Sequence, residues 1–177
     1  MTIIALSNIV LNTLAILLVI LMVAIGAQVL FSALDINPVL GFAEQLPFVG
    51  KAISLNSLLD FQWHLLVITG LLPAGLVWLQ DKHVRVDFFY SRRSAGWQNG
   101  TDLIGNLVFA LPFFALMLPA AWDFAGRAWR SDEGSRNGGL NDLWLIKGVL
   151  PIGIALLALA VLLETISFLR RRAAARG

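Results

Sequence analysis

The sequence predicts an all-α integral membrane protein built as a bundle of four transmembrane helices. Of its 177 residues, 58% are hydrophobic, and the mean hydropathy is +0.80. Only 14% are charged, whereas a soluble domain has about 25% charged residues. The charges are also confined to short segments, which leaves long apolar runs between them. A helix that crosses about 30 Å of hydrocarbon needs roughly 20 such residues.

The four spans follow from these runs. Four stretches contain no Asp, Glu, Lys or Arg: residues 1–34, 61–80, 103–122 and 148–163. The last stretch is short, but Trp144 to Leu169 reaches the required length if Lys147 and Glu164 lie near opposite membrane interfaces. We therefore expect one membrane domain, residues 1–177, with spans at about 9–33, 61–80, 103–123 and 144–169.

The segment between the first two spans predicts a short interfacial helix at about residues 42–56. Its apolar residues follow the spacing of one helical face: Phe42, Leu46, Val49 and Ile53. The segment is too short to cross a bilayer, so we expect it to lie along the membrane surface. Pro47 fits a first helical turn, where its missing N–H does no harm. An irregular loop broken by Gly41 and Gly50 is the alternative.

The distribution of Lys and Arg predicts the orientation. With four spans, both termini lie on the same side as the loop after the second span. That side carries eight Lys and Arg residues and the other side five, and cytoplasmic segments carry the excess. We therefore expect cytoplasmic N- and C-termini, and no nucleic acid is needed to explain the net charge of +2. Aromatic and basic residues at the span ends are expected to be lipid and topology anchors: Trp63, Trp78, Arg92, Arg93, Arg170, Arg171 and Arg172.

No span contains residues that suggest chemistry. Ionisable groups at membrane depth mark ion paths, proton relays and substrate sites, and the middle of every span lacks them. Asn106 is expected to form a hydrogen bond between helices. His64 and His83 are 19 residues apart, about 28 Å along a helix, so they cannot ligate one haem within a chain. With no cysteine and no recognisable catalytic motif, we expect no enzyme, no catalytic residue, no metal ligand and no cofactor.

Two charges near the ends of the fourth span require partners. Lys147 lies at the positive end of the helix dipole and Glu164 near the negative end, so both positions are unfavourable. Asp142, Glu133 or a lipid phosphate would suit Lys147. The arginines at 170–172, or a second protein, would suit Glu164. Solvated side chains that reach the membrane interface are the alternative for both.

Three stretches of the chain resemble a known family. They are "DKHVRVDFFYSRRS" after the second span, "DLIGNLVFALPF" in the third, and "SDEGSRNGGLNDLWLIKGVLPIGIALLAL" leading into the fourth. Together with "FQWHLL", they are similar to the small membrane subunit of tripartite ATP-independent periplasmic (TRAP) transporters, the DctQ-like family. The resemblance covers roughly residues 58–168. Asp132 and Asn141 depart from the pattern, because Gly and Pro are frequent at those positions. The residues that carry the likeness are His83, Arg85, Asp87, Glu133, Ser135, Gly138, Gly139, Lys147 and Pro151.

The resemblance implies a small permease subunit, or scaffold, of a sodium-driven secondary transporter in the bacterial inner membrane. A periplasmic binding protein would deliver an organic acid to a large elevator-type membrane subunit, which would carry the substrate and sodium sites. The small subunit would pack against the large one and stabilise it, with no substrate-binding residue of its own. A membrane anchor subunit of a redox complex and a homo-oligomeric channel are the alternatives.

The second loop is expected to contain a polar cluster of His83, Arg85 and Asp87, because His and Asp add nothing to a topology signal. Arg92 and Arg93 are expected to bind phospholipid headgroups. Alternatively, Asp87 begins a short helix as its N-cap, or the cations of this loop only fix the topology.

The third loop, which connects the third and fourth spans, is expected to face the periplasm. Glu133, Ser135, Gly138 and Gly139 are therefore candidates for contact with the binding protein or with the large subunit. The alternative is a tight turn that is stabilised by its own hydrogen bonds.

Overall fold

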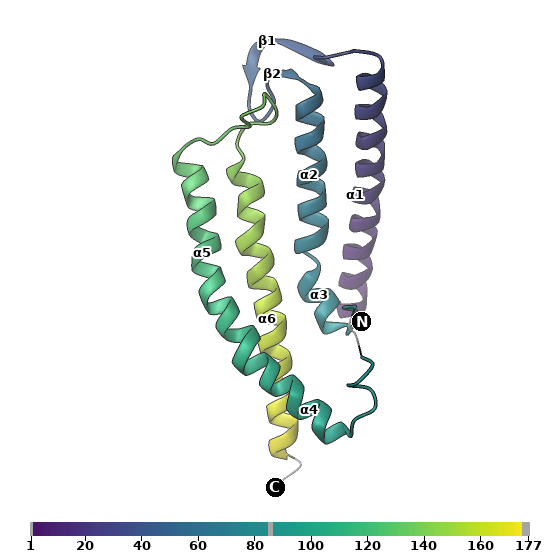
Figure 1. Ribbon diagram of the computed structural model, residues 1–177, viewed down its shortest axis with the longest axis vertical. Coiled ribbons are helices and arrows are strands. Elements are labelled where there is room, and N and C mark those ends of the chain that lie inside the picture. The colour runs from purple at the N-terminus through teal and green to yellow at the C-terminus, as the bar shows by residue number, and fades with distance from the viewer. Residues whose placement is uncertain (1, 85–86, 175–177) are drawn as a thin grey trace. The chain divides into compact units, whose positions relative to one another are not determined.

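The computed structural model describes residues 2–84 and 87–174 and contains the four predicted transmembrane helices (Figure 1). Within these described residues, four helical segments are long and apolar enough to cross a membrane: Ile9–Ala33, Leu55–Leu79, Ala95–Arg130 and Trp144–Ala174. Many large apolar side chains on them are exposed, among them Met22 (71%), Phe109 (70%) and Leu116 (75%). Such exposure suits side chains that face lipid, and the protein is a multi-pass membrane protein.

The individual elements subdivide these spans. In chain order they are α1 (Thr2–Ala33), β1 (Leu40–Leu46), β2 (Gly50–Ile53), α2 (Leu55–Leu71), α3 (Ala74–Leu79), α4 (Ala95–Ile104), the π-helical segment η1 (Gly105–Ala110), α5 (Leu111–Arg130) and α6 (Trp144–Ala174). Pro73 lies between α2 and α3 and has no N–H for a helical bond. Pro112 is the second residue of α5, after η1 ends at Ala110, and it also has no N–H for a helical bond.

The predicted interfacial helix at about residues 42–56 is wrong. The segment is an antiparallel hairpin of β1 and β2, with Leu40 opposite Ile53 and Leu46 opposite Gly50. Its turn requires left-handed backbone at Phe48 (φ 66°) and Gly50 (φ 75°), which no helix provides. The apolar spacing predicts a helix, but hydrogen bonds of the Phe48 backbone to Asn141 and Asp142 stabilise the hairpin turn instead.

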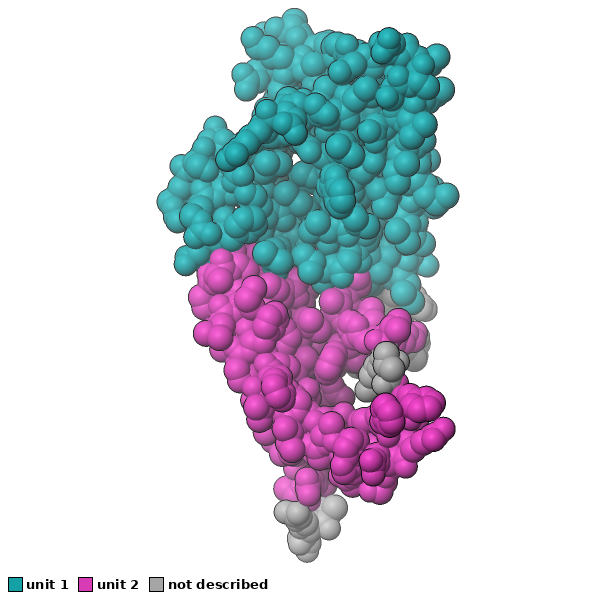
Figure 2. Space-filling view, viewed as in Figure 1, with its two compact units in different colours: residues 1–71, 122–150 teal, residues 72–121, 151–177 magenta. Residues whose placement is uncertain are grey.

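The chain forms two compact units, residues 1–71 with 122–150 and residues 72–121 with 151–177 (Figure 2). In the first unit, α1 and α2 lie side by side, and the hairpin follows the end of α1 (Figure 1). The Gln62 amide of α2 donates hydrogen bonds to the Gln28 side chain (2.9 Å) and to the Ala24 carbonyl (3.2 Å) of α1. Polar side chains thus join two otherwise apolar helices, as expected inside lipid.

The second unit is packed through small residues. Gly75 of α3 lies so close to α6 that an added Cβ would be 2.7 Å from the Leu156 carbonyl oxygen. Ala160 and Val161 of α6 are almost fully buried. Close backbone approach of this kind gives dispersion contacts that lipid cannot replace.

Candidate functional site: a loop cap, a polar cluster and a basic helix end

The third loop and the hairpin turn form one hydrogen-bonded structure within the first unit. We call it the loop cap: residues 47–49, residues 54–60 and residues 131–143. Ser54 Oγ donates to the Gly138 carbonyl (2.7 Å), and Asn56 Nδ2 donates to the Asn137 carbonyl (2.5 Å). The beginning of α2 therefore holds the third loop through its backbone carbonyls.

Asp60 fixes the Gly-Gly-Leu segment of the loop cap. Its Oδ2 accepts a hydrogen bond from the Leu140 N–H (3.0 Å). Gly139 is buried, and a Cβ at this position would lie 1.9 Å from that same carboxylate oxygen and 2.7 Å from Ser135 Oγ. A side chain there would displace the Asp60 carboxylate and the Ser135 hydroxyl, so glycine serves close approach at this position rather than an unusual φ. Sequence reasoning missed Asp60, which was visible only as the charge that precedes the uncharged run of residues 61–80.

The hairpin turn is held by the opposite end of the loop. Asn141 N–H donates to the Phe48 carbonyl (2.7 Å), and Phe48 N–H donates to Asp142 Oδ2 (3.2 Å). Both backbone groups of Phe48 are thus satisfied by residues more than 90 positions away. The strained left-handed conformation at Phe48 is held by these two bonds.

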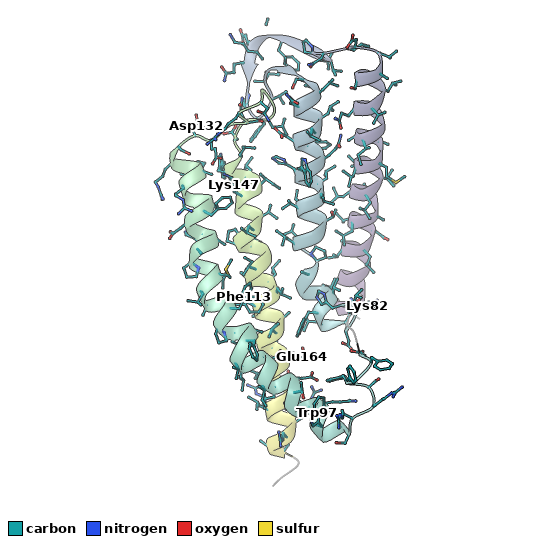
Figure 3. The ribbon with its side chains drawn as sticks, viewed as in Figure 1. Lys82, Trp97, Phe113, Asp132, Lys147 and Glu164 are labelled. Carbon is teal, nitrogen blue, oxygen red and sulfur yellow. The ribbon has the colours of Figure 1, made fainter. Side chains whose placement is uncertain are left out.

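Lys147 forms an ion pair with Glu133, which confirms one of the three partners expected for it. The Nζ–Oε2 distance is 2.5 Å, with side chains 20% and 37% exposed. The ammonium also lies 4.5 Å from the centre of the Phe124 ring, a favourable cation–π distance. Figure 3 shows Lys147 near the beginning of α6, close to the third loop. The pair joins α6 to the loop, so Lys147 and Glu133 are positioned by each other.

A second group of polar residues, the polar cluster, lies in the second unit. Trp78 Nε1 donates to Glu164 Oε2, Asn106 Nδ2 donates to Thr165 Oγ1 (3.1 Å), and the Tyr90 hydroxyl donates to Asp102 Oδ2 (2.5 Å). The interhelical bond expected of Asn106 is confirmed. Glu164 bonds to Trp78 and not to the neighbouring arginines, and sequence reasoning missed this pair.

The predicted cluster of His83, Arg85 and Asp87 falls partly outside the described residues, because Arg85 is not among them. His83 Nε2 lies 3.1 Å from the Ala74 carbonyl, and its ring is 5.7 Å from that of Trp78. The Asp87 carbonyl accepts from Ser91 N–H (2.9 Å). Residues 88–92 form turns, so the alternative of a helix that begins after Asp87 is wrong.

The expected anchors occupy different environments. Trp63 is 59% exposed, whereas Trp78 is half-buried beside Glu164. The Arg92 and Arg93 guanidinium groups lie over the rings of Phe88 (4.8 Å) and Trp97 (5.5 Å). The last turns of α6 carry the exposed basic residues Arg170, Arg171 and Arg172. Pro151 is buried inside α6.

Within residues 2–84 and 87–174, no group of three His, Asp or Glu side chains is arranged to hold a metal ion. The carboxylates described above accept hydrogen bonds from neutral groups or, for Glu133, pair with a lysine.

Comparison with known sequences agrees with this geometry. Among curated proteins, no sequence matches the chain. A family model described as "Tripartite ATP-independent periplasmic transporters, DctQ component" matches residues 48–171. The match covers the loop cap except Pro47, the polar cluster, two spans in full and most of the last span, and this family is a transporter component rather than an enzyme class. Membership implies partnership with a large membrane subunit and a periplasmic binding protein. The chain belongs to the DctQ family and is the small membrane subunit of a TRAP transporter.

Proposed function

We propose that this chain is the static scaffold of a sodium-driven TRAP transporter that imports an organic acid. In this role it packs against the large elevator-type subunit and stabilises it, while the substrate and sodium sites lie on that subunit. We place the protein in the bacterial inner membrane with both termini in the cytoplasm, as the excess of basic residues on that side favours.

The observation that carries this proposal is where the polar groups lie and what they bind. The bonds of Asp60, Asp142, Glu133 and Glu164 are made to groups of the same chain. A substrate or ion path would instead need ionisable groups in the middle of the spans, and the sequence places none there. The exposed side chains of the spans are mainly apolar, and such faces suit packing against lipid and another membrane subunit.

The loop cap is the surface that we assign to partner contact on the periplasmic side. Its backbone is fixed by side chains of the same chain, so its shape exists before any partner arrives. A preformed surface binds without the entropic cost of ordering a loop. The binding protein and the large subunit are both candidates for this contact.

Co-purification tests the proposal without knowledge of the substrate. The tagged chain is isolated from its native membrane in mild detergent, and the proteins that accompany it are identified and quantified by mass spectrometry. We expect one large polytopic subunit at a near one-to-one ratio. Recovery of the chain alone, or with haem proteins and a haem absorbance spectrum, would contradict the scaffold role and favour the redox-anchor alternative.

A further inference from the structure

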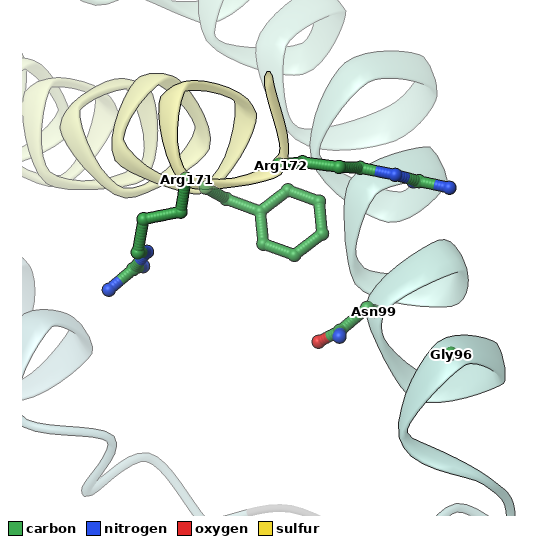
Figure 4. A pocket seen from close by; sticks show the side chains of 5 residues that line it. Gly96, Asn99, Arg171 and Arg172 are labelled. Carbon is green, nitrogen blue, oxygen red and sulfur yellow. The ribbon is translucent and has the colours of Figure 1, made fainter. Parts of the chain in front are cut away.

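The end of α6 and the beginning of α4 line an open basic pocket, and its arginines are expected above only to act as general lipid and topology anchors. The pocket has a volume of about 480 Å³ and is lined by Gly96, Asn99, Phe168, Arg171 and Arg172 (Figure 4). All five residues belong to the second unit. In Figure 4, Arg171 and Arg172 leave α6 in different directions, and the Asn99 side chain projects from α4 toward the opening.

The two pocket arginines have no anionic partner in the described part of the chain. No carboxylate there lies within 4.0 Å of either guanidinium group. Arg171 also lines a smaller neighbouring pocket of about 170 Å³ with Asp102 and Glu164, but hydroxyl and indole donors already bind those two carboxylates. Two guanidinium groups without a carboxylate partner and an amide donor line the same pocket, and these are donors that suit an anion with several oxygens, such as a phosphate.

The position of the pocket favours an amphiphilic ligand over a soluble anion. The uncharged run of α6 ends at Glu164, and the basic triplet begins at Arg170, so Phe168 lies where hydrocarbon gives way to water. An apolar wall on one side and guanidinium groups on the other match the two parts of a lipid molecule, its acyl chains and its charged headgroup.

We propose that this pocket binds the phosphate headgroup of an anionic phospholipid, with Arg171 and Arg172 as the anion ligands and Asn99 as an additional hydrogen-bond donor. The inference requires only that the chain is a membrane protein, and it does not depend on the scaffold role. The proposal also divides the basic residues of the second unit into two classes. Arg92 and Arg93 lie over aromatic rings and serve as general anchors, whereas Arg171 and Arg172 form a defined site.

The test is a lipid titration of the purified full-length chain in detergent, followed by native mass spectrometry. The probes are dioleoyl-phosphatidylglycerol, dioleoyl-phosphatidylcholine and inorganic phosphate. Arg171→Ala/Arg172→Ala removes the site, and Arg92→Ala/Arg93→Ala removes the same charge elsewhere. We expect the first phosphatidylglycerol to bind about tenfold more weakly to the site variant, with a much smaller loss for the control variant.

The outcomes separate the possible ligands. Preference for phosphatidylglycerol over phosphatidylcholine, with little competition by millimolar inorganic phosphate, supports the lipid site. Complete competition by inorganic phosphate would overturn it in favour of a soluble phosphate site. Equal losses in the two double variants would also overturn it, because binding would then follow net charge alone. Unfolding temperatures of both variants are measured alongside, and Arg171→Lys/Arg172→Lys, which keeps charge but loses the planar fork, should retain part of the affinity.

Discussion

The loop cap and the polar cluster use polar side chains in opposite ways. In the loop cap, side chains of α2 and of the third loop bond to backbone groups: Asp60 to Leu140 N–H, Asp142 to Phe48 N–H, Ser54 to the Gly138 carbonyl. In the polar cluster, side chains bond to side chains, as in Trp78 with Glu164 and Asn106 with Thr165. The first arrangement fixes the path of a loop, and the second holds helices together. Bonds from side chain to backbone therefore give a shaped surface, and bonds between side chains give a helix clamp.

Among substitutions in the two regions, we expect the largest loss of stability from a change at Gly139 in the loop cap. Gly139→Ala places a Cβ in collision with the Asp60 carboxylate and the Ser135 hydroxyl, so both side chains must move and the bond of Asp60 to the Leu140 N–H is lost. We expect a loss of unfolding free energy of about 3 kcal/mol or more, measured by tryptophan fluorescence during denaturation of the purified chain. Gly148→Ala is the matched control, because a Cβ there meets nothing within 4 Å, and it should be neutral or slightly stabilising.

A rescue experiment sharpens this prediction. Asp60→Ala alone leaves the Leu140 N–H without its acceptor and should cost about 1–3 kcal/mol. In the double variant the carboxylate that collides with the new methyl group is absent, so the combined loss should be smaller than the sum of the two single losses. Strict additivity would show that Gly139 and Asp60 do not meet as described.

The Lys147–Glu133 pair should give an intermediate effect. Lys147→Met leaves Glu133 half-buried without its cation, and we expect a loss of about 2 kcal/mol, between the values typical of exposed and buried pairs. A double-mutant cycle with Glu133→Gln measures the coupling. Arg136→Met, an exposed change in the same loop, is the control and should change stability by less than about 0.5 kcal/mol. A coupling energy near zero would exclude the pair as a structural link.

The smallest effects belong to the polar cluster. Trp78→Phe removes the indole donor to Glu164, and Asn106→Leu removes the donor to Thr165. Each should cost about 0.6–1.5 kcal/mol, as interhelical hydrogen bonds in membranes do. The two changes should be nearly additive if the bonds act as separate clamps. Losses larger than that of Gly139→Ala would show that the polar cluster contributes more to stability than the loop cap does, contrary to this account.

Sequence reasoning located the helices better than it located the contacts between them. The four spans were predictable because lipid imposes a length and a composition on each helix. The need of Lys147 for an anion was predictable because it lies at the positive end of the helix dipole, and Glu133, 14 residues away, was one of three candidate partners. The hairpin was not, because the bond of Phe48 to Asp142 spans 94 residues. The bonds of Asp60 to Leu140 and of Trp78 to Glu164 could not be predicted either, because they join residues that are 80 and 86 positions apart.

The central claim is that the loop cap takes its shape from this chain alone, before any partner binds. Hydrogen–deuterium exchange of the isolated full-length subunit tests it most directly, through peptides that cover Phe48 and Leu140. The account predicts that these two amides exchange on the order of 100-fold more slowly than an unstructured loop, and that Asp60→Ala removes the protection at Leu140. Exchange at the unstructured rate in the isolated chain, with protection only after the large subunit is added, would contradict it.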